Sequence, residues 1–97
     1  MNPIVIIATL TLKASADEKV LSALKALHEA THKNDEGCLQ YDLHEDKENK
    51  HTYVFVETWQ SEALLKAHME KPHFKAFQEA LEGKVERMSI QTLDKLL

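Results

Sequence analysis

The segment at residues 53–77 constrains the fold most, because it places an apolar strand directly before a helix that a proline must interrupt. Its first seven residues are rich in β-branched and aromatic side chains and include the only tryptophan, Trp59, which favours a strand. Ser61 then stands at an N-cap position, with Glu62 in the first helical turn. Pro72 disfavours helix at the residue before it, so we expect one helix to end there and another to begin at Pro72.

The N-terminal half predicts a strand followed by a helix. Residues 4–12 are mostly apolar and β-branched, as in a strand covered on both faces at one end. A helical stripe with spacings of three and four begins at Ser15 and reaches about Lys33. Residues 34–37 end this helix, and Gly37 suits a left-handed turn.

Two strands and a short polar connection follow. Residues 38–46 alternate as in a half-solvated strand, which places Leu39, Tyr41 and Leu43 on one side. The polar run at 47–51 leads into the strand at 52–60, so the pair predicts a hairpin. After the interrupted helix, the chain closes with a strand over Val85–Leu93, in which Met88 and Ile90 face the same way.

This order, β-α-β-β-α-β, predicts one ferredoxin-like α+β domain over residues 1–97, with an antiparallel sheet and both helices on one face. The first and third strands should be central. Val5, Ile7 and one parity of the third strand would then form an apolar patch on the other face, larger than soluble monomers usually expose. We therefore predict a homodimer that packs sheet against sheet across a two-fold axis.

The composition of the chain excludes some classes of binding partner. The chain has 97 residues and a formal net charge of −4, which argues against nucleic acid and against an anionic membrane surface. We see no leader peptide and no apolar run near the ~20 residues that span a bilayer, so a soluble, cytoplasmic protein is expected. The single cysteine, Cys38, cannot form an internal disulfide, and we interpret it as a small buried strand residue rather than a reactive thiol.

Three motifs occur in order on this frame: EGCLQYDLHED at 36–46, YVFVETWQS at 53–61 and LLKAHMEKPHFKAF at 64–77. In these motifs the chain resembles the antibiotic biosynthesis monooxygenase family, especially its short quinol-monooxygenase-like members. The resemblance covers nearly the whole chain and implies a dimeric α+β barrel. Similar chains include cofactor-independent monooxygenases of phenols or quinols, haem-degrading enzymes and an isomerase of a phosphorylated signalling sugar, so the family alone does not choose the reaction.

Two histidines of the third motif are candidate catalytic residues. His68 follows Leu64 and Leu65 by four and three residues, so it should face the sheet, where a neutral imidazole could act as general base. The alternative is a core histidine bonded to backbone or to a tyrosine hydroxyl. His73 matches the motif's second histidine, and its alternative role is to hold the helix bend by a hydrogen bond.

Aromatic residues complete the predicted site. Trp59 could offer a flat wall and one donor to a planar substrate, or could simply be the largest core residue. Tyr41 and Tyr53 could orient a substrate oxygen, although most tyrosines at such positions only pack. With Phe74, they form the predicted substrate-binding set.

The other histidines predict no metal centre. His28 and His32 have i, i+4 spacing, but no third ligand is evident in the sequence, so a solvated helix edge is the favoured interpretation. His44 and His51 should lie on the exposed side and tip of the hairpin. The chain has no glycine-rich phosphate loop and no dinucleotide fingerprint, so no cofactor is expected.

The leading functional hypothesis is a cofactor-independent monooxygenase that holds a quinol or phenol against Trp59, deprotonates it toward His68 and lets the anion reduce dioxygen. An isomerase of a small hydroxyketone would use the same base, but a phosphorylated substrate would have only Lys66, Lys71 and Lys75 nearby. Haem degradation is disfavoured, because Gln78 stands at the position where the resemblance would require the axial histidine. A non-catalytic dimer that binds a small ligand is a further alternative.

Overall fold

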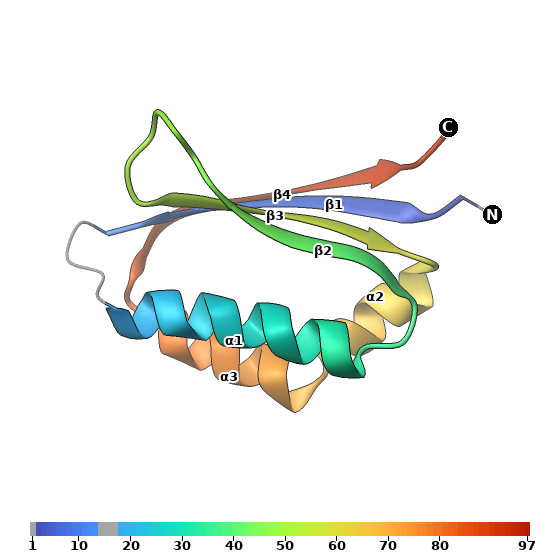
Figure 1. Cartoon of the computed structure of the whole chain (residues 1–97), viewed down its shortest axis with the longest axis horizontal. Coiled ribbons are helices and arrows are strands. Elements are labelled where there is room, and N and C mark those ends of the chain that lie inside the picture. The colour runs from blue at the N-terminus through green and yellow to red at the C-terminus, as the bar shows by residue number, and fades with distance from the viewer. Residues whose placement is uncertain (1, 14–17) are drawn as a thin grey trace.

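The computed structural model describes residues 2–13 and 18–97, and Figure 1 shows its sheet above a layer of helices. The elements are β1 Ile4–Leu12, α1 Glu18–Asn34, β2 Cys38–Glu45, β3 Thr52–Trp59, α2 Glu62–Met69, α3 Pro72–Leu81 and β4 Val85–Asp94. The predicted α+β order is confirmed, with the second helical region divided into α2 and α3. The predicted helix start at Ser15 lies outside the described residues.

The sheet is antiparallel with strand order β2-β3-β1-β4, so the prediction that the first and third strands are central is confirmed. Ile6 of β1 pairs with Glu57 of β3, and Ala8 pairs with Phe55. Because side chains alternate along strands, these four residues face the helices while their neighbours face the opposite side. The register therefore brings Glu57 onto the covered face.

Helix boundaries follow from local chemistry. The Ser61 hydroxyl caps α2 by accepting a hydrogen bond from the backbone N–H of Leu64 at 3.3 Å. Pro72 occupies the first turn of α3, where its missing N–H costs nothing, as predicted. The apolar stripe of α1 is buried against the sheet, and its fully covered residues are Val20, Leu24, Leu27 and Thr31. Helices α1 and α3 also contact each other and lie side by side against the same face of the sheet (Figure 1).

The start of β2 departs from the predicted alternation. The pairing register with β3 shifts between Cys38 and Gln40, which is a bulge, and Leu39 is 60% exposed. The prediction that Leu39 shares a face with buried Tyr41 is therefore wrong, because the extra residue reverses the alternation at that point. Cys38 is half-buried rather than buried.

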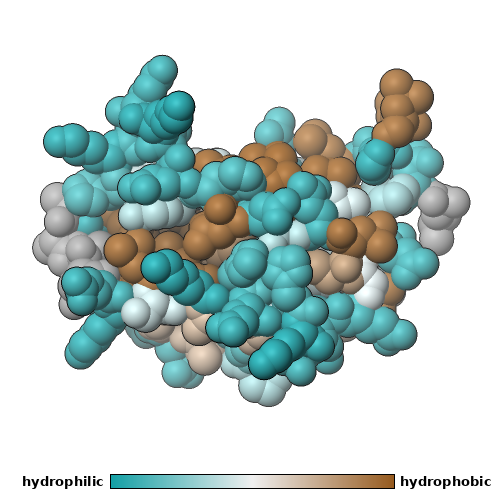
Figure 2. Space-filling view, in the orientation of Figure 1, coloured by the Kyte–Doolittle hydropathy of each residue, from teal (hydrophilic) through white to brown (hydrophobic). Residues whose placement is uncertain are grey.

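Apolar side chains remain in contact with solvent at two places. The face opposite the helices carries Val5, Ile7, Val54 and Val56, all partly exposed. The second place is the edge strand β4, where Met88 and Ile90 are more than half exposed, together with Leu96 and Leu97 at the C-terminal end. Figure 2 shows apolar atoms between the strand and helix layers and at the C-terminal end. Within residues 2–13 and 18–97, no helix is long and apolar enough to cross a membrane.

Candidate active site

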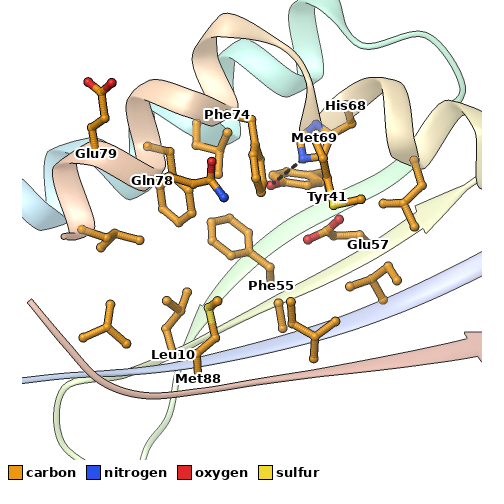
Figure 3. A pocket seen from close by; sticks show the side chains of 18 of the residues that line it. Leu10, Tyr41, Phe55, Glu57, His68, Met69, Phe74, Gln78, Glu79 and Met88 are labelled. Carbon is orange, nitrogen blue, oxygen red and sulfur yellow. Dashed lines mark hydrogen bonds between the residues drawn. The ribbon is translucent and has the colours of Figure 1, made fainter. Parts of the chain in front are cut away.

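A cavity of about 520 Å³ lies between the sheet and the helices (Figure 3). Its walls are mostly apolar side chains of β1, β3, α3 and β4, among them Ile6, Leu10, Phe55, Phe74, Phe77 and Met88. Tyr41, Glu57 and His68 gather at one end, and Gln78 and Glu79 of α3 lie toward the other (Figure 3). Such a cavity, apolar with a few convergent polar groups, suits a small organic ligand with one polar end.

His68 lies at the polar end and is 2% exposed, so the prediction that it faces inward is confirmed. Its Nδ1 is hydrogen-bonded to Asp35 Oδ2, and its ring packs on Trp59 and Phe74 at centroid distances of 4.6 and 5.0 Å. Burial lowers the pKa of His68, although the hydrogen bond to Asp35 and its charge act in the opposite direction. A neutral imidazole therefore donates through Nδ1 and keeps its Nε2 lone pair for a proton.

Asp35 is a site residue that the sequence analysis did not predict, because its position in the turn that ends the first helix gives no sign of a further role. The Asp35 side chain is 1% exposed. His73 Nε2 lies 2.9 Å from Asp35 Oδ1, within ion-pair distance but not aligned as a hydrogen bond. Asp35 thus lies between two imidazoles and can stabilise positive charge on His68.

The turn at Gly37 explains how Asp35 reaches α2. Gly37 has φ +81°, and a Cβ built there would lie 2.3 Å from Leu64 Cδ1. Only a residue without a side chain lets this turn approach α2 so closely. The close approach brings Asp35 to His68, which follows Leu64 by one turn of the same helix.

Tyr41 supplies the second polar group of the cavity. Its hydroxyl lies 3.5 Å from His68 Nε2, the long limit of a hydrogen bond. Burial, followed by the charge of Glu57, raises the pKa of the phenol, so the hydroxyl stays protonated and can donate. Asp35, His68 and Tyr41 therefore form a chain of polar groups that ends in the cavity.

Glu57, the third polar group, lies within the motif at 53–61 and is a second site residue that the sequence analysis did not predict. Glu57 is 6% exposed, and its carboxylate accepts a hydrogen bond from Trp59 Nε1 at 2.9 Å. Burial raises the pKa of Glu57 to about 7, while the bond from Trp59 acts in the opposite direction. Its place between Phe55 and Trp59 on the apolar side of β3 was a signal that could have revealed it.

The structure brings some of the predicted aromatic residues to the cavity. Tyr41 and Phe74 line it, whereas Trp59 and Tyr53 are not among its lining residues. The indole of Trp59 is fully buried against His68 and bonded to Glu57, a position that agrees with the alternative that Trp59 is the largest core residue. Trp59 instead supports two cavity residues from behind.

The remaining polar candidates lie outside the cavity. His44 and His51 are exposed on the hairpin, as predicted. Burial raises the pKa of Cys38 to about 11, which agrees with an unreactive thiol. His32 Nε2 donates to the backbone oxygen of Tyr41 at 2.7 Å, so its ring covers a carbonyl at the edge of β2.

Fold and cavity together define a small ferredoxin-like domain with a histidine-bearing pocket between its sheet and helices. The chain belongs to the antibiotic biosynthesis monooxygenase family, whose profile matches residues 3–80. The solved structures that share the whole fold include the following two. The Pseudomonas aeruginosa protein PA3566 has 33% identity and a TM-score of 0.89, covering 100% of this chain and 97% of that one. A conserved protein of Methanosarcina mazei has 27% identity and a TM-score of 0.89, covering 99% and 95%.

Relatives with assigned names point to oxygenase chemistry. A Bacillus subtilis protein named "Putative monooxygenase YcnE" is 36% identical over 74 residues, which are 76% of this chain and 77% of that protein. The Escherichia coli "Probable quinol monooxygenase YgiN" is 48% identical over 40 residues, only 41% of this chain and 38% of YgiN. The match to an uncharacterized Synechocystis protein covers 52% of its length. The family and these names support a monooxygenase-type function.

Proposed function

We propose that this chain is a monooxygenase that oxidises a small quinol or phenol with dioxygen, without a bound cofactor and with His68 as general base. The observation that carries the proposal is the placement of His68. Its Nε2 side faces the polar end of an apolar cavity, while Asp35 holds its Nδ1–H. A base needs this arrangement, because the carboxylate both selects the reactive tautomer and stabilises the imidazolium that forms.

The proposed reaction begins when the substrate hydroxyl gives its proton to His68 Nε2. The Tyr41 hydroxyl then donates to the resulting oxyanion, which an apolar cavity would otherwise destabilise. The electron-rich anion passes electrons to dioxygen, and a carbon–oxygen bond forms to give a hydroperoxide. The peroxide oxygen takes back the proton held by His68. Glu57 then gives a proton to the departing oxygen as the O–O bond breaks and water leaves, and the hydrogen on the oxygenated carbon is lost as a proton that the Glu57 carboxylate takes up. For a hydroquinone the balance is quinol plus dioxygen to hydroxyquinone plus water, so no external reductant is needed.

The charge of the cavity favours this substrate class over phosphorylated ones. The described residues that line it include the acids Glu57, Glu79 and Glu82 but no lysine or arginine. A phosphorylated hydroxyketone would need a cationic clamp, and Lys66, Lys71 and Lys75 are not among the lining residues. An uncharged quinol meets no such conflict, so we rank the isomerase hypothesis lower.

The position of Gln78 bears on haem degradation. Gln78 lines the cavity at the place where the family resemblance would require an axial histidine. Its side-chain amide is a poor substitute for an imidazole ligand of iron. This residue therefore supports a small quinol rather than haem as the substrate.

The proposal is tested by oxygen uptake with a chemically reduced naphthohydroquinone, prepared without air and mixed with aerated protein. We expect turnover above the spontaneous rate, and one atom of ¹⁸O from labelled dioxygen in the quinone product. His68→Gln should lower turnover by about 10²–10⁴-fold, since an amide cannot take up a proton near neutral pH. His44→Gln, on the exposed side of the hairpin, is the matched control and should keep wild-type turnover.

Two results would contradict the proposal. One is a quinone that carries no labelled oxygen, which would indicate simple oxidation with release of peroxide. The other is a folded His68→Gln protein that turns over at the wild-type rate, since His68 would then only brace the core.

We also propose that the chain works as a homodimer joined through its sheets. The sheet face opposite the described helices carries four partly exposed apolar side chains, those of Val5, Ile7, Val54 and Val56. Contiguous apolar side chains of this kind favour association, and a two-fold axis lets one patch cover an identical one.

A further inference from the structure

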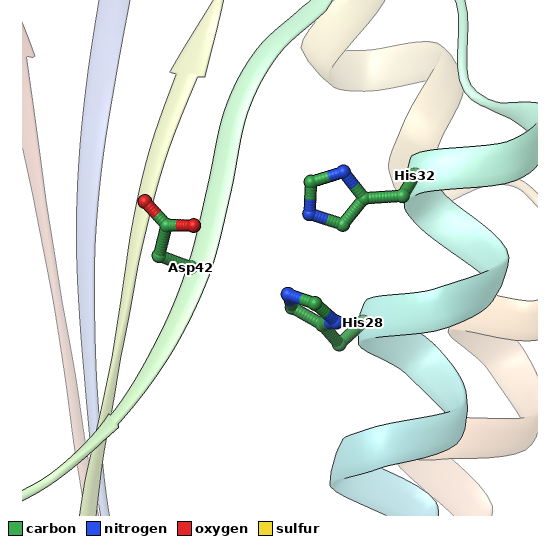
Figure 4. A group of neighbouring side chains, drawn as sticks. All are labelled: His28, His32 and Asp42. Carbon is green, nitrogen blue, oxygen red and sulfur yellow. The ribbon is translucent and has the colours of Figure 1, made fainter.

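A second group of ligand-type side chains lies outside the cavity, between α1 and the edge strand β2. His28 and His32 project from one face of α1 toward β2, which carries Asp42 (Figure 4). One ligand atom from each of the three residues lies within 4.8 Å of the others, and the two imidazole centroids are 4.5 Å apart. The sequence offered only two ligands here, and the fold brings Asp42 to them as a third.

We propose that His28, His32 and Asp42 bind one borderline divalent cation of the Zn²⁺ type at the outer edge of β2. Two imidazole nitrogens and one carboxylate oxygen form a donor set that Zn²⁺ accepts, at distances near 2.0–2.2 Å. Helical i, i+4 spacing places both imidazoles on one side of α1. His32 and Asp42 are exposed, so water can complete the coordination.

The backbone around the three ligands is held by buried neighbours. Leu27 and Thr31 of α1 lie in the core next to His28 and His32, and buried Tyr41 precedes Asp42 on β2. The side chains themselves need only small changes. Asp42 Oδ2 accepts one hydrogen bond from Gln40 Nε2 at 3.0 Å, which leaves other lone pairs free.

Binding a cation through Nε2 of His32 would break one hydrogen bond. Its Nε2–H now donates to the Tyr41 carbonyl at 2.7 Å, and a cation taken by that nitrogen would replace the bond. The carbonyl belongs to an edge strand, where water can take over the lost interaction. Zn²⁺ binding should therefore change the NMR signals of the β2 backbone as well as those of the two imidazoles.

Asp35, His68 and His73 are also close enough to share a metal, but they fit one less well. The Asp35 carboxylate already faces both imidazoles, and the side chains of Asp35 and His68 are each 1% exposed. A cation would have to displace the Nδ1 proton of His68 inside a nearly closed site. The geometry therefore assigns the ion to the open cluster on α1 and β2.

The test is a calorimetric titration of the untagged protein with ZnCl₂, repeated on single variants whose melts match wild type. We expect one Zn²⁺ per chain for wild type. His28→Gln and Asp42→Asn should each weaken Zn²⁺ binding by at least ~10–100-fold, because even the loss of an outer-shell partner of a metal has an effect of that size. His73→Gln is the matched control and should bind as wild type does. In NMR spectra, Zn²⁺ should shift the ring signals of His28 and His32 before those of His68.

Three outcomes would overturn the proposal. Wild type that takes up no Zn²⁺ at millimolar concentration would remove the site. Equal binding by wild type and His28→Gln would place any ion elsewhere. Loss of binding in His73→Gln, with His28→Gln unaffected, would assign the metal to the cluster beside the cavity.

Discussion

Replacing Glu57 with glutamine should stabilise the folded protein, and the gain should grow as the pH rises. Glu57 is 6% exposed, and its pKa is raised from 4.5 to about 7, mainly by burial. Folding therefore increases the proton affinity of this carboxyl group. Its contribution to stability is complete below the unfolded pKa of 4.5 and is lost as the pH rises to about 7, because the unfolded chain ionises first.

The magnitude follows from the size of the shift. Each pKa unit corresponds to about 1.4 kcal/mol, so moving from 4.5 to about 7 costs the wild type roughly 3 kcal/mol between pH 4 and pH 8. Glutamine stays neutral throughout, and its carbonyl oxygen can accept the Trp59 Nε1–H bond. The free energy of unfolding of Glu57→Gln, relative to wild type, should therefore increase by roughly 3 kcal/mol over this range.

Urea unfolding followed by Trp59 fluorescence measures this difference at several pH values and one protein concentration. A gain of this size should raise the melting temperature at pH 8 by about 10 °C or more. Glu29→Gln, at an exposed position of α1, is the control and should show no comparable gain. A stability difference between Glu57→Gln and wild type that is the same at pH 4 and pH 8 would refute the reasoning, since the carboxyl would then titrate alike in both states.

Three further predictions concern the base, the turn and the uncovered sheet face. Asp35→Asn should lower turnover in the quinol assay by about 10²–10⁴-fold, because an amide no longer selects the tautomer of His68, and rates near wild type would contradict this. Gly37→Ala should cost roughly 1–3 kcal/mol more in urea unfolding than Gly83→Ala, since both glycines have positive φ but a Cβ at Gly83 meets none of the described residues within 4 Å. Equal losses would show that the contact with α2 relaxes. Ile7→Asp should yield monomers in sedimentation experiments, and a wild type that is monomeric at low micromolar concentration would exclude the dimer.

Much of the fold was predictable because its signals are local. Pro72 breaks the helical region, Ser61 caps α2, and Gly37 takes the left-handed conformation that a turn needs. The central strands were predictable because apolar residues at both parities indicate burial on two faces. The exposed position of Leu39 could not be predicted, because the alternation of side chains does not reveal a bulge that inserts one residue into the pairing with β3.

The site was predictable only in part, because some of its contacts follow from local sequence spacing and others join residues far apart in the chain. The inward direction of His68 follows from helical spacing within α2. The neighbours of Trp59 could not be predicted, because strand periodicity indicates which face a side chain takes but not which residues cover it. Glu57 could have been found, since an acid between Phe55 and Trp59 on the buried side of a strand must lose water.

Asp35 could not have been predicted by any local rule, because an acid before glycine at the end of a helix is an ordinary turn residue. Its role depends on a contact between segments 27 residues apart, namely the approach of Gly37 to Leu64. A side chain at Gly37 would push the turn away from α2 and withdraw the Asp35 carboxylate from His68. One glycine thus links backbone geometry to the state of the proposed base. Under our proposal, Gly37→Ala should therefore reduce oxygen uptake per folded molecule as well as stability, whereas Gly83→Ala should leave that activity unchanged.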